Sequence, residues 1–191
     1  MSNLKNPINF ETAFQLLNEK LKEDNLELEL ICVGGYVLQL HGFKYTLDVD
    51  AFYNSNSELD QIIWKVGEQL GLNLDYEPWL NNSVSNMSRT PPKKYVEKTS
   101  QYSNLTVNSA CLDYVVGMKL CSGREKDIED VKDIIARDKK DLFGYKAELN
   151  EMGFHVDFSL LLDAYEKAFG LEWLANFYKD HEEKLMDLMY R

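Results

Sequence analysis

The sequence lacks the patterns that mark membrane, secreted and zinc-binding proteins. No apolar run approaches the roughly 20 residues needed to span a bilayer, and the opening stretch MSNLKNPINF lacks the apolar centre of a signal peptide. The three cysteines and three histidines are scattered, without CxxC or HExxH spacing. We therefore expect a cytoplasmic protein with no membrane partner and no zinc site of these types.

Basic residues are also scarce. The chain has 21 Lys and Arg against 32 Asp and Glu, which gives a net charge of -11. Because broad nucleic-acid surfaces need clustered cations to displace counterions, we expect no broad non-specific DNA binding. The stretch RTPPKKYVEK, residues 89–98, is locally basic. It suits either a solvated loop or a contact with RNA or a nucleotide.

The 191 residues, 45% of them hydrophobic, are enough for a substantial core. Strand patterns gather in the first part and helical patterns in the second. The sequence therefore predicts an α+β fold, with a small mixed β-sheet and flanking helices in residues 1–108 and a helical C-terminal region in residues 109–191. Expected strands are 26–33, 46–53, 93–100 and 104–110. Expected helices are 10–23, 36–41, 57–71, 110–123, 124–138, 141–153, 156–169 and 171–190, and residues 73–92 are expected to form a long loop with room for one helical turn.

Two aspartates, Asp48 and Asp50, stand two positions apart in an apolar run. In a strand, residues i and i+2 share a face, so both carboxylates can converge on one cation while Leu47, Val49 and Ala51 enter the core. Mg²⁺ prefers oxygen ligands and usually keeps waters and substrate phosphates in its shell. The alternative is a strand end with solvated carboxylates.

The Gly34-Gly35 step joins a predicted strand to a predicted helix. Backbone N–H groups at a helix start can bind phosphate, although a tight turn needs glycine equally. A phosphate cradle and the carboxylate pair of the next strand are complementary. Together they describe a nucleoside triphosphate site.

The stretch GGYVLQLHGFKYTLDVD, residues 34–50, resembles the signature of the nucleotidyltransferase superfamily. It resembles more closely the minimal bacterial branch that includes abortive-infection and toxin–antitoxin nucleotidyltransferases. MKLCSGREKDIEDV, residues 118–131, is similar to a later helix pair of that family, and WLNNSV, residues 79–84, resembles a stretch of some uncharacterised relatives.

The resemblance implies a role for each matching residue. Asp48 and Asp50 would hold Mg²⁺ or Mn²⁺ and act in catalysis together with Lys119, which would reach a phosphate. The nucleotide would be bound by Gly34, Gly35, Thr46, Arg124 and Asp127. From the residues alone, Lys119 also suits a lysine whose stem packs on an apolar surface. Arg124 and Asp127 suit an ion-paired helix start as well.

The sequence departs from the family pattern where many members carry a third carboxylate. The later strand offers Asn104, Thr106 and Asn108, which alternation places on one face, and WLNNSV has Asn82 at a second candidate position for an acid. Two hypotheses follow. The first is a Mg²⁺-dependent enzyme that moves a nucleoside monophosphate from an NTP to a hydroxyl on RNA or protein. The second is a weak or inactive relative that binds a nucleotide or serves as an antitoxin-type partner.

Overall fold

The computed structural model describes residues 9–189, with side chains described for residues 9–185. Its contacts divide the chain into two compact units between Val115 and Val116, inside helix α4 (Leu112–Ser122). We call residues up to 115 the first unit and residues from 116 the second unit. Among residues 9–189, no helix is both long enough and apolar enough to cross a membrane.

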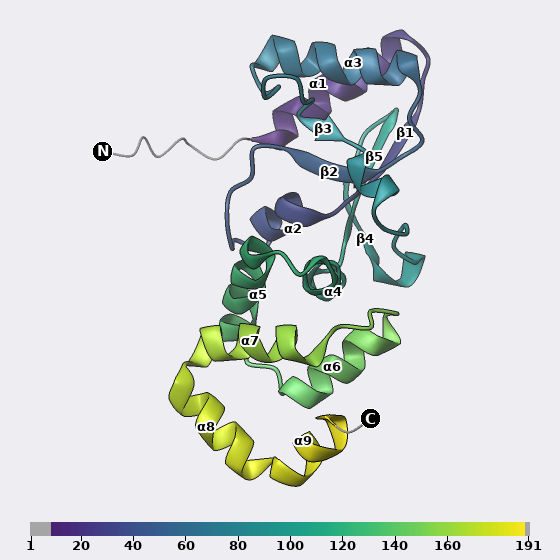
Figure 1. Ribbon diagram of the computed structural model, residues 1–191. Helices are drawn as coiled ribbons and strands as arrows, with labels where there is room; N and C mark the ends of the chain where they lie inside the picture. Colours follow the sequence, from purple (N-terminus) through teal and green to yellow (C-terminus); the bar gives the residue numbers. More distant parts are fainter. Residues whose placement is uncertain (1–8, 190–191) are drawn as a thin grey trace, which may run out of the picture. The chain divides into compact units, whose positions relative to one another are not determined.

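The first unit contains a five-stranded sheet in the order β3-β2-β1-β5-β4 (Figure 1). Strand β1 pairs with β2 antiparallel and with β5 parallel, β2 pairs with β3 parallel, and β4 pairs with β5 antiparallel. The α+β class with a small mixed sheet is therefore confirmed. The strands are β1 (Leu28–Cys32), β2 (Val49–Phe52), β3 (Leu80–Asn81), β4 (Val96–Gln101) and β5 (Leu105–Ala110).

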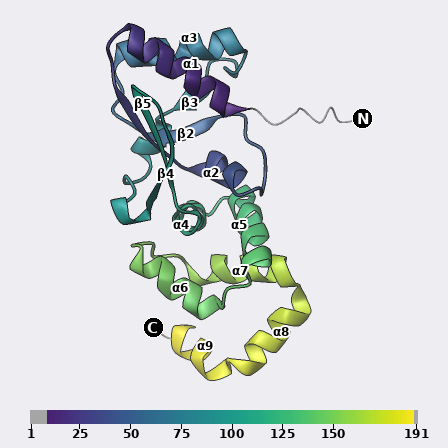
Figure 2. The same cartoon turned by 180° about the vertical axis from the view of Figure 1, so that it is seen from behind.

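Helices α1 (Phe10–Glu23) and α3 (Ser57–Leu70) lie side by side over one face of this sheet, as Figures 1 and 2 both show. Helix α1 forms as predicted, because its apolar residues recur at helical spacing and the Asn9 side chain accepts a hydrogen bond from Glu11 N at its start. The core between the helices and the sheet includes Phe10, Phe14, Leu17, Leu21, Leu30, Val49, Ala51, Ile63, Trp79, Leu105 and Val107.

Several expected boundaries in this unit are wrong. Helix α2 (Gly34–Leu40) begins at Gly34 rather than Tyr36. Helix α3 begins at Ser57 as expected, ends one residue earlier than expected, and is capped by Asn56, whose side chain accepts from Leu59 N. The second strand covers only Val49–Phe52, so Leu47 lies in the preceding loop and is 44% exposed instead of entering the core. The short turns η1 (Ser83–Asn86) and η2 (Lys93–Tyr95) flank the later strands.

The expected loop 73–92 contains strand β3, which the sequence prediction missed. The fully buried Trp79 fixes this strand from the preceding position: its Nε1 donates to Ile63 O at 3.1 Å, and its carbonyl oxygen accepts from Val49 N at 2.7 Å. Asn73 Oδ1 accepts from Trp79 N at 3.2 Å. Gly67 of α3 faces this segment so closely that a Cβ there would overlap Asn73 Oδ1 and lie 2.7 Å from Trp79 Cδ1.

The second unit is helical, as expected. Its helices after α4 are α5 (Glu125–Asp138), α6 (Leu142–Glu151), α7 (Phe158–Phe169), α8 (Leu171–Asp180) and α9 (Glu182–Met189). The single helix predicted over 171–190 is wrong, because the chain leaves the helical conformation at His181, where φ is -128°. The last residue of that prediction, 190, lies outside the described residues.

Candidate functional site

The Asp48–Asp50 pair lies at the start of β2. Val49 and Ala51 are fully buried on the core side of the sheet, so strand alternation places Asp50 on the opposite face. Asp48 precedes the strand, and its Oδ1 accepts a hydrogen bond from Thr46 Oγ1 at 2.9 Å. Thr46 is itself held by Gln39, whose Oε1 accepts from Thr46 N at 2.9 Å. The loop therefore presents Asp48 in a defined orientation.

The two glycines lie directly against this loop and strand. Gly34 has a left-handed φ of +59°, and a Cβ there would lie 3.0 Å from Asp50 Oδ2. A Cβ at Gly35 would lie 2.6 Å from Thr46 Oγ1 and 2.9 Å from Thr46 Cβ. Both positions therefore need glycine for close approach. The structure brings together all five predicted residues of the first unit: Gly34, Gly35, Thr46, Asp48 and Asp50.

The carboxylate pair fits a Mg²⁺ ion that keeps much of its shell for other ligands. Among the described side chains, no group of three or more His, Cys, Asp or Glu is arranged to hold a metal ion. Asp48 and Asp50 offer two hard oxygen ligands. Mg²⁺ is commonly bound through one or two carboxylates plus substrate phosphates and water, so this donor set is chemically suitable.

Strand β5 turns the expected face toward Asp50. Leu105 and Val107 are buried in the core with Val49, so Thr106 and Asn108 lie on the face of the sheet that carries Asp50. Both polar side chains already have partners. Asn108 Nδ2 donates to Glu29 Oε1 at 2.9 Å, and Thr106 Oγ1 accepts from Gln101 Nε2 at 2.9 Å. Strand β5 contains no carboxylate, and β1 lies between it and β2, the strand of Asp50.

The direct neighbour of Asp50 is instead Asn81. The two residues are paired in the parallel β2–β3 register, so their side chains lie on the same face. Sequence reasoning missed this contact because β3 has only two residues and no periodicity. The signal that could have found it was the family resemblance of WLNNSV, but the sequence prediction singled out Asn82 in that stretch instead of Asn81.

In the second unit, Lys119, Arg124 and Asp127 form one ion cluster, in which Lys119 and Asp127 are buried and Arg124 is about half exposed. Lys119 Nζ lies 2.6 Å from Asp127 Oδ1 and 2.7 Å from Asp130 Oδ2. Asp127 Oδ2 accepts from Arg124 Nε and from Ser122 Oγ, both at 2.6 Å. The Asp127 side chain is only 2% exposed. These contacts hold α4 to the start of α5 through charge-assisted hydrogen bonds.

The ionisation of Asp127 is set by these partners. Burial alone raises the pKa of a carboxyl group, but the hydrogen bonds and charge of Lys119, together with the hydrogen bonds from Ser122 and Arg124, outweigh it and lower the pKa of Asp127 to about 2. Asp127 is therefore a carboxylate at neutral pH, when it accepts hydrogen bonds and carries no proton to give.

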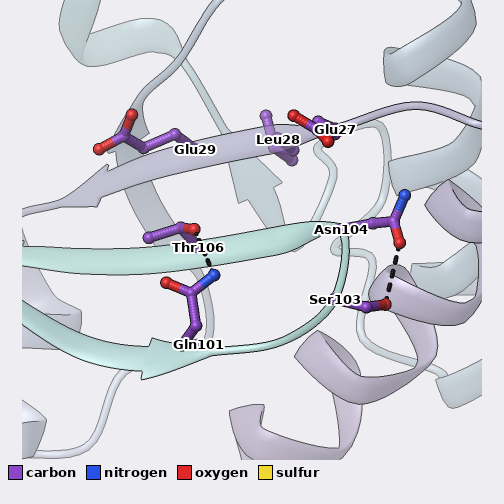
Figure 3. A pocket seen from close by; sticks show the side chains of 7 residues that line it. All are labelled: Glu27, Leu28, Glu29, Gln101, Ser103, Asn104 and Thr106. Carbon is purple, nitrogen blue, oxygen red and sulfur yellow. Dashed lines mark hydrogen bonds between the residues drawn. The ribbon is translucent and has the colours of Figure 1, made fainter.

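An open pocket of about 440 Å³ lies at the end of the sheet where β1 begins (Figure 3). Glu29, Thr106 and Gln101 come from three neighbouring strands there, and the Gln101–Thr106 hydrogen bond crosses the pocket lining. None of the predicted site residues lines it. Its lining consists of Glu27, Leu28, Glu29, Gln101, Ser103, Asn104 and Thr106.

Comparison with known proteins identifies the family. The family described as "Nucleotidyltransferase of unknown function (DUF6036)" matches residues 9–151. The chain belongs to this family. The match includes the stretches 34–50, 79–84 and 118–131, on which the resemblance rested, and it ends at the last residue of α6. No curated protein and no solved structure shows a significant match.

The residues grouped in the first unit lie within the part of the chain that matches the nucleotidyltransferase family. Glycines, a threonine and two aspartates meet at one end of the sheet, within the matched residues. Helices α7, α8 and α9 lie beyond the match.

Proposed function

We propose that this protein is a Mg²⁺-dependent nucleotidyltransferase that moves a nucleoside monophosphate from an NTP to a hydroxyl group on RNA or on a protein. The observation that carries the proposal is the grouping of Gly34, Gly35, Thr46, Asp48 and Asp50 within a chain of the nucleotidyltransferase family. Mn²⁺ has similar ligand preferences and would serve as a substitute.

The proposed reaction is a displacement at the α-phosphorus of the NTP. The acceptor hydroxyl oxygen forms the new P–O bond, the bond to the oxygen that bridges the α- and β-phosphates breaks, and pyrophosphate leaves with that electron pair. The hydroxyl proton passes to water. Mg²⁺, when bound, neutralises phosphate charge as it develops.

The residues of the chain position these groups. Asp48 and Asp50 hold the cation, and Thr46 fixes the Asp48 carboxylate through its hydrogen bond. The glycines allow the backbone to approach the triphosphate because they carry no side chain. For Lys119, the proposed phosphate contact rests on the resemblance, as do the nucleotide-binding roles of Arg124 and Asp127.

The second candidate is a nucleotide-binding protein with weak or no transfer activity, acting as one partner of a toxin–antitoxin-type complex. The observation that favours it is the neutral character of Thr106 and Asn108 on β5, the strand where the resemblance leads us to expect a third carboxylate. A neutral amide does not accept the proton of an attacking hydroxyl, so transfer would be slow unless the acceptor is already ionised.

The test is incubation with Mg²⁺ and each labelled NTP in turn, followed by a search for label on the protein, on added tRNA and on any co-purified partner. We expect transfer that is lost in Asp48→Asn and Asp50→Asn. The matched control is Asp24→Asn, which removes the same charge from an exposed position of the first unit.

The possible outcomes are distinct. Retained transfer in both variants would overturn the assignment of Asp48 and Asp50. Binding of an NTP by the wild type without transfer to any acceptor would favour the second candidate. Absence of NTP binding by the wild type would overturn both.

A further inference from the structure

Asn81 has no part in the function proposed above, although it is the residue paired with Asp50 across β2 and β3. We propose that Asn81 is a phosphate-binding residue, whose Nδ2 donates hydrogen bonds to a phosphate oxygen of the substrate held beside Asp50. This inference rests on the proposed function, because it assumes that a phosphate group binds on this face of the sheet.

The neighbours of Asn81 determine which end of its amide points where. Asn81 Oδ1 accepts from Ser83 N at 3.2 Å and from Ser83 Oγ at 2.6 Å. A backbone N–H group can only donate, so the atom facing Ser83 must be the oxygen. The nitrogen therefore points away from Ser83. Within residues 9–185, the structure records no hydrogen bond from it, which leaves its two N–H donors for a ligand.

The strand that carries Asn81 is held firmly in place. Trp79 is buried between α1 and α3, and its carbonyl oxygen accepts from Val49 N in β2. Leu80, between Trp79 and Asn81, is also fully buried. A donor fixed in this way loses little conformational entropy when it binds a ligand.

The electrostatics of the face favour a neutral donor at this position. Asp48 and Asp50 attract a cation but repel the phosphate that accompanies it. An amide N–H group adds a hydrogen bond to an anionic oxygen without adding negative charge. A third carboxylate at position 81 would instead strengthen the repulsion of phosphate.

The adjacent Asn82 provides an internal contrast. Its Nδ2 already donates to Tyr53 O at 2.8 Å, and its Oδ1 accepts from Ser85 Oγ. Both ends of the Asn82 amide are thus used within the fold. Of the two asparagines in WLNNSV, Asn81 is the one with donors to offer.

The experiment measures the binding of inorganic triphosphate by titration calorimetry in the presence of Mg²⁺. Triphosphate is the probe because it lacks a base and a sugar, so a change in affinity reports phosphate contacts. We expect Asn81→Asp to bind about tenfold more weakly or worse, as expected for the loss of a hydrogen bond to a charged group. Its unfolding temperature should stay close to that of the wild type, because a carboxylate oxygen still accepts from Ser83.

The matched control is Asn82→Asp, which places the same charge one residue further along. We expect its triphosphate affinity to stay within about twofold of the wild type. Its unfolding temperature should fall, because a carboxylate would face the carbonyl oxygen of Tyr53 in place of the amide donor. Affinity and stability should therefore respond in opposite ways in the two variants.

Three results would overturn the inference. Unchanged triphosphate affinity in Asn81→Asp would overturn it while leaving the proposed function intact. Weaker binding of Mg²⁺ alone by Asn81→Ser would show that Asn81 is a ligand of the cation and not of phosphate. Absence of triphosphate binding by the wild type would overturn this inference, and the proposed function would fall with it only if no NTP binds either. If Asn81→Asp fails to fold, Asn81→Ser replaces it and is expected to show the same loss of affinity.

Discussion

Gly35 and Thr46 approach each other so closely that position 35 has no room for a side chain. Gly35→Ala should lower the free energy of unfolding by about 1–3 kcal/mol, because the new methyl group would overlap the Thr46 side chain. Urea denaturation measures this change. In a Thr46→Gly background the cost should shrink, because Oγ1 and Cβ are both removed. An equal cost in both backgrounds would contradict the steric explanation.

This close approach could not be predicted from the sequence. The Gly34-Gly35 step predicted a site near Asp48 and Asp50, and the structure does bring these residues together. The sequence explained the two glycines only by a tight turn or by phosphate binding. The packing of Thr46 against Gly35 depends instead on the path of the loop between α2 and β2. Asn81 was missed for a related reason, since strand register is a property of two segments about 30 residues apart.

The contact between α4 and α5 depends on the charge of Asp127. Since the folded-state pKa of Asp127 is lowered to about 2 from the ordinary aspartate value of 3.8, its ionised form stabilises the folded chain above about pH 4. This contribution, between about 1 and 2 kcal/mol after allowance for the partly exposed Arg124, is lost as the pH falls toward 2. Asp127→Asn should therefore cost several kcal/mol near pH 7, because it also leaves Lys119 with less compensation.

Urea denaturation at pH 6, 4 and 3 tests this prediction. The difference in stability between the wild type and Asp127→Asn should narrow toward acid. Asp133→Asn is the control, because this carboxylate is 58% exposed and lies 3.7 Å from Lys132. A difference that stays constant from pH 6 to 3 would show that the pKa of Asp127 is not lowered.

Long amphipathic helices were the elements that the sequence predicted best. Helices α1 and α3 bury residues at regular helical spacing, and their length makes that period clear. Strand β3 has two residues and no period, so its existence depends on Trp79 and the core. The break at His181 was missed because apolar residues continue at helical spacing on both sides of it, while the backbone turns.

At the scale of the whole molecule, the net charge of -11 opposes association with polyanions. Labelled duplex DNA of arbitrary sequence should bind with a dissociation constant above about 100 µM at physiological salt, as fluorescence anisotropy would measure. Tighter, salt-dependent binding would contradict this expectation. A Lys93→Glu, Lys94→Glu variant would then show whether the exposed basic stretch 89–98 is responsible.

The fold class and the family were accessible from the sequence because they depend on short motifs and on periodicity summed over many residues. The grouping of Asp48 and Asp50 with the two glycines could be predicted in the same way, because it depends on a short motif of the family. The partners of each polar side chain could not, since Thr106, Asn108 and Lys119 are each tied to residues on another strand or helix.

The contact of Gly67 with Asn73 and Trp79 has an evolutionary consequence. Position 67 lies on helix α3, and the strand that it allows to pass leads directly to Asn81. A mutation that adds a side chain at position 67 would therefore displace the segment from Asn73 to Trp79, and with it Asn81. Selection on Asn81 would then extend to helix α3, which packs on the opposite face of the sheet, and positions 67, 73 and 79 should covary among descendants of this sequence.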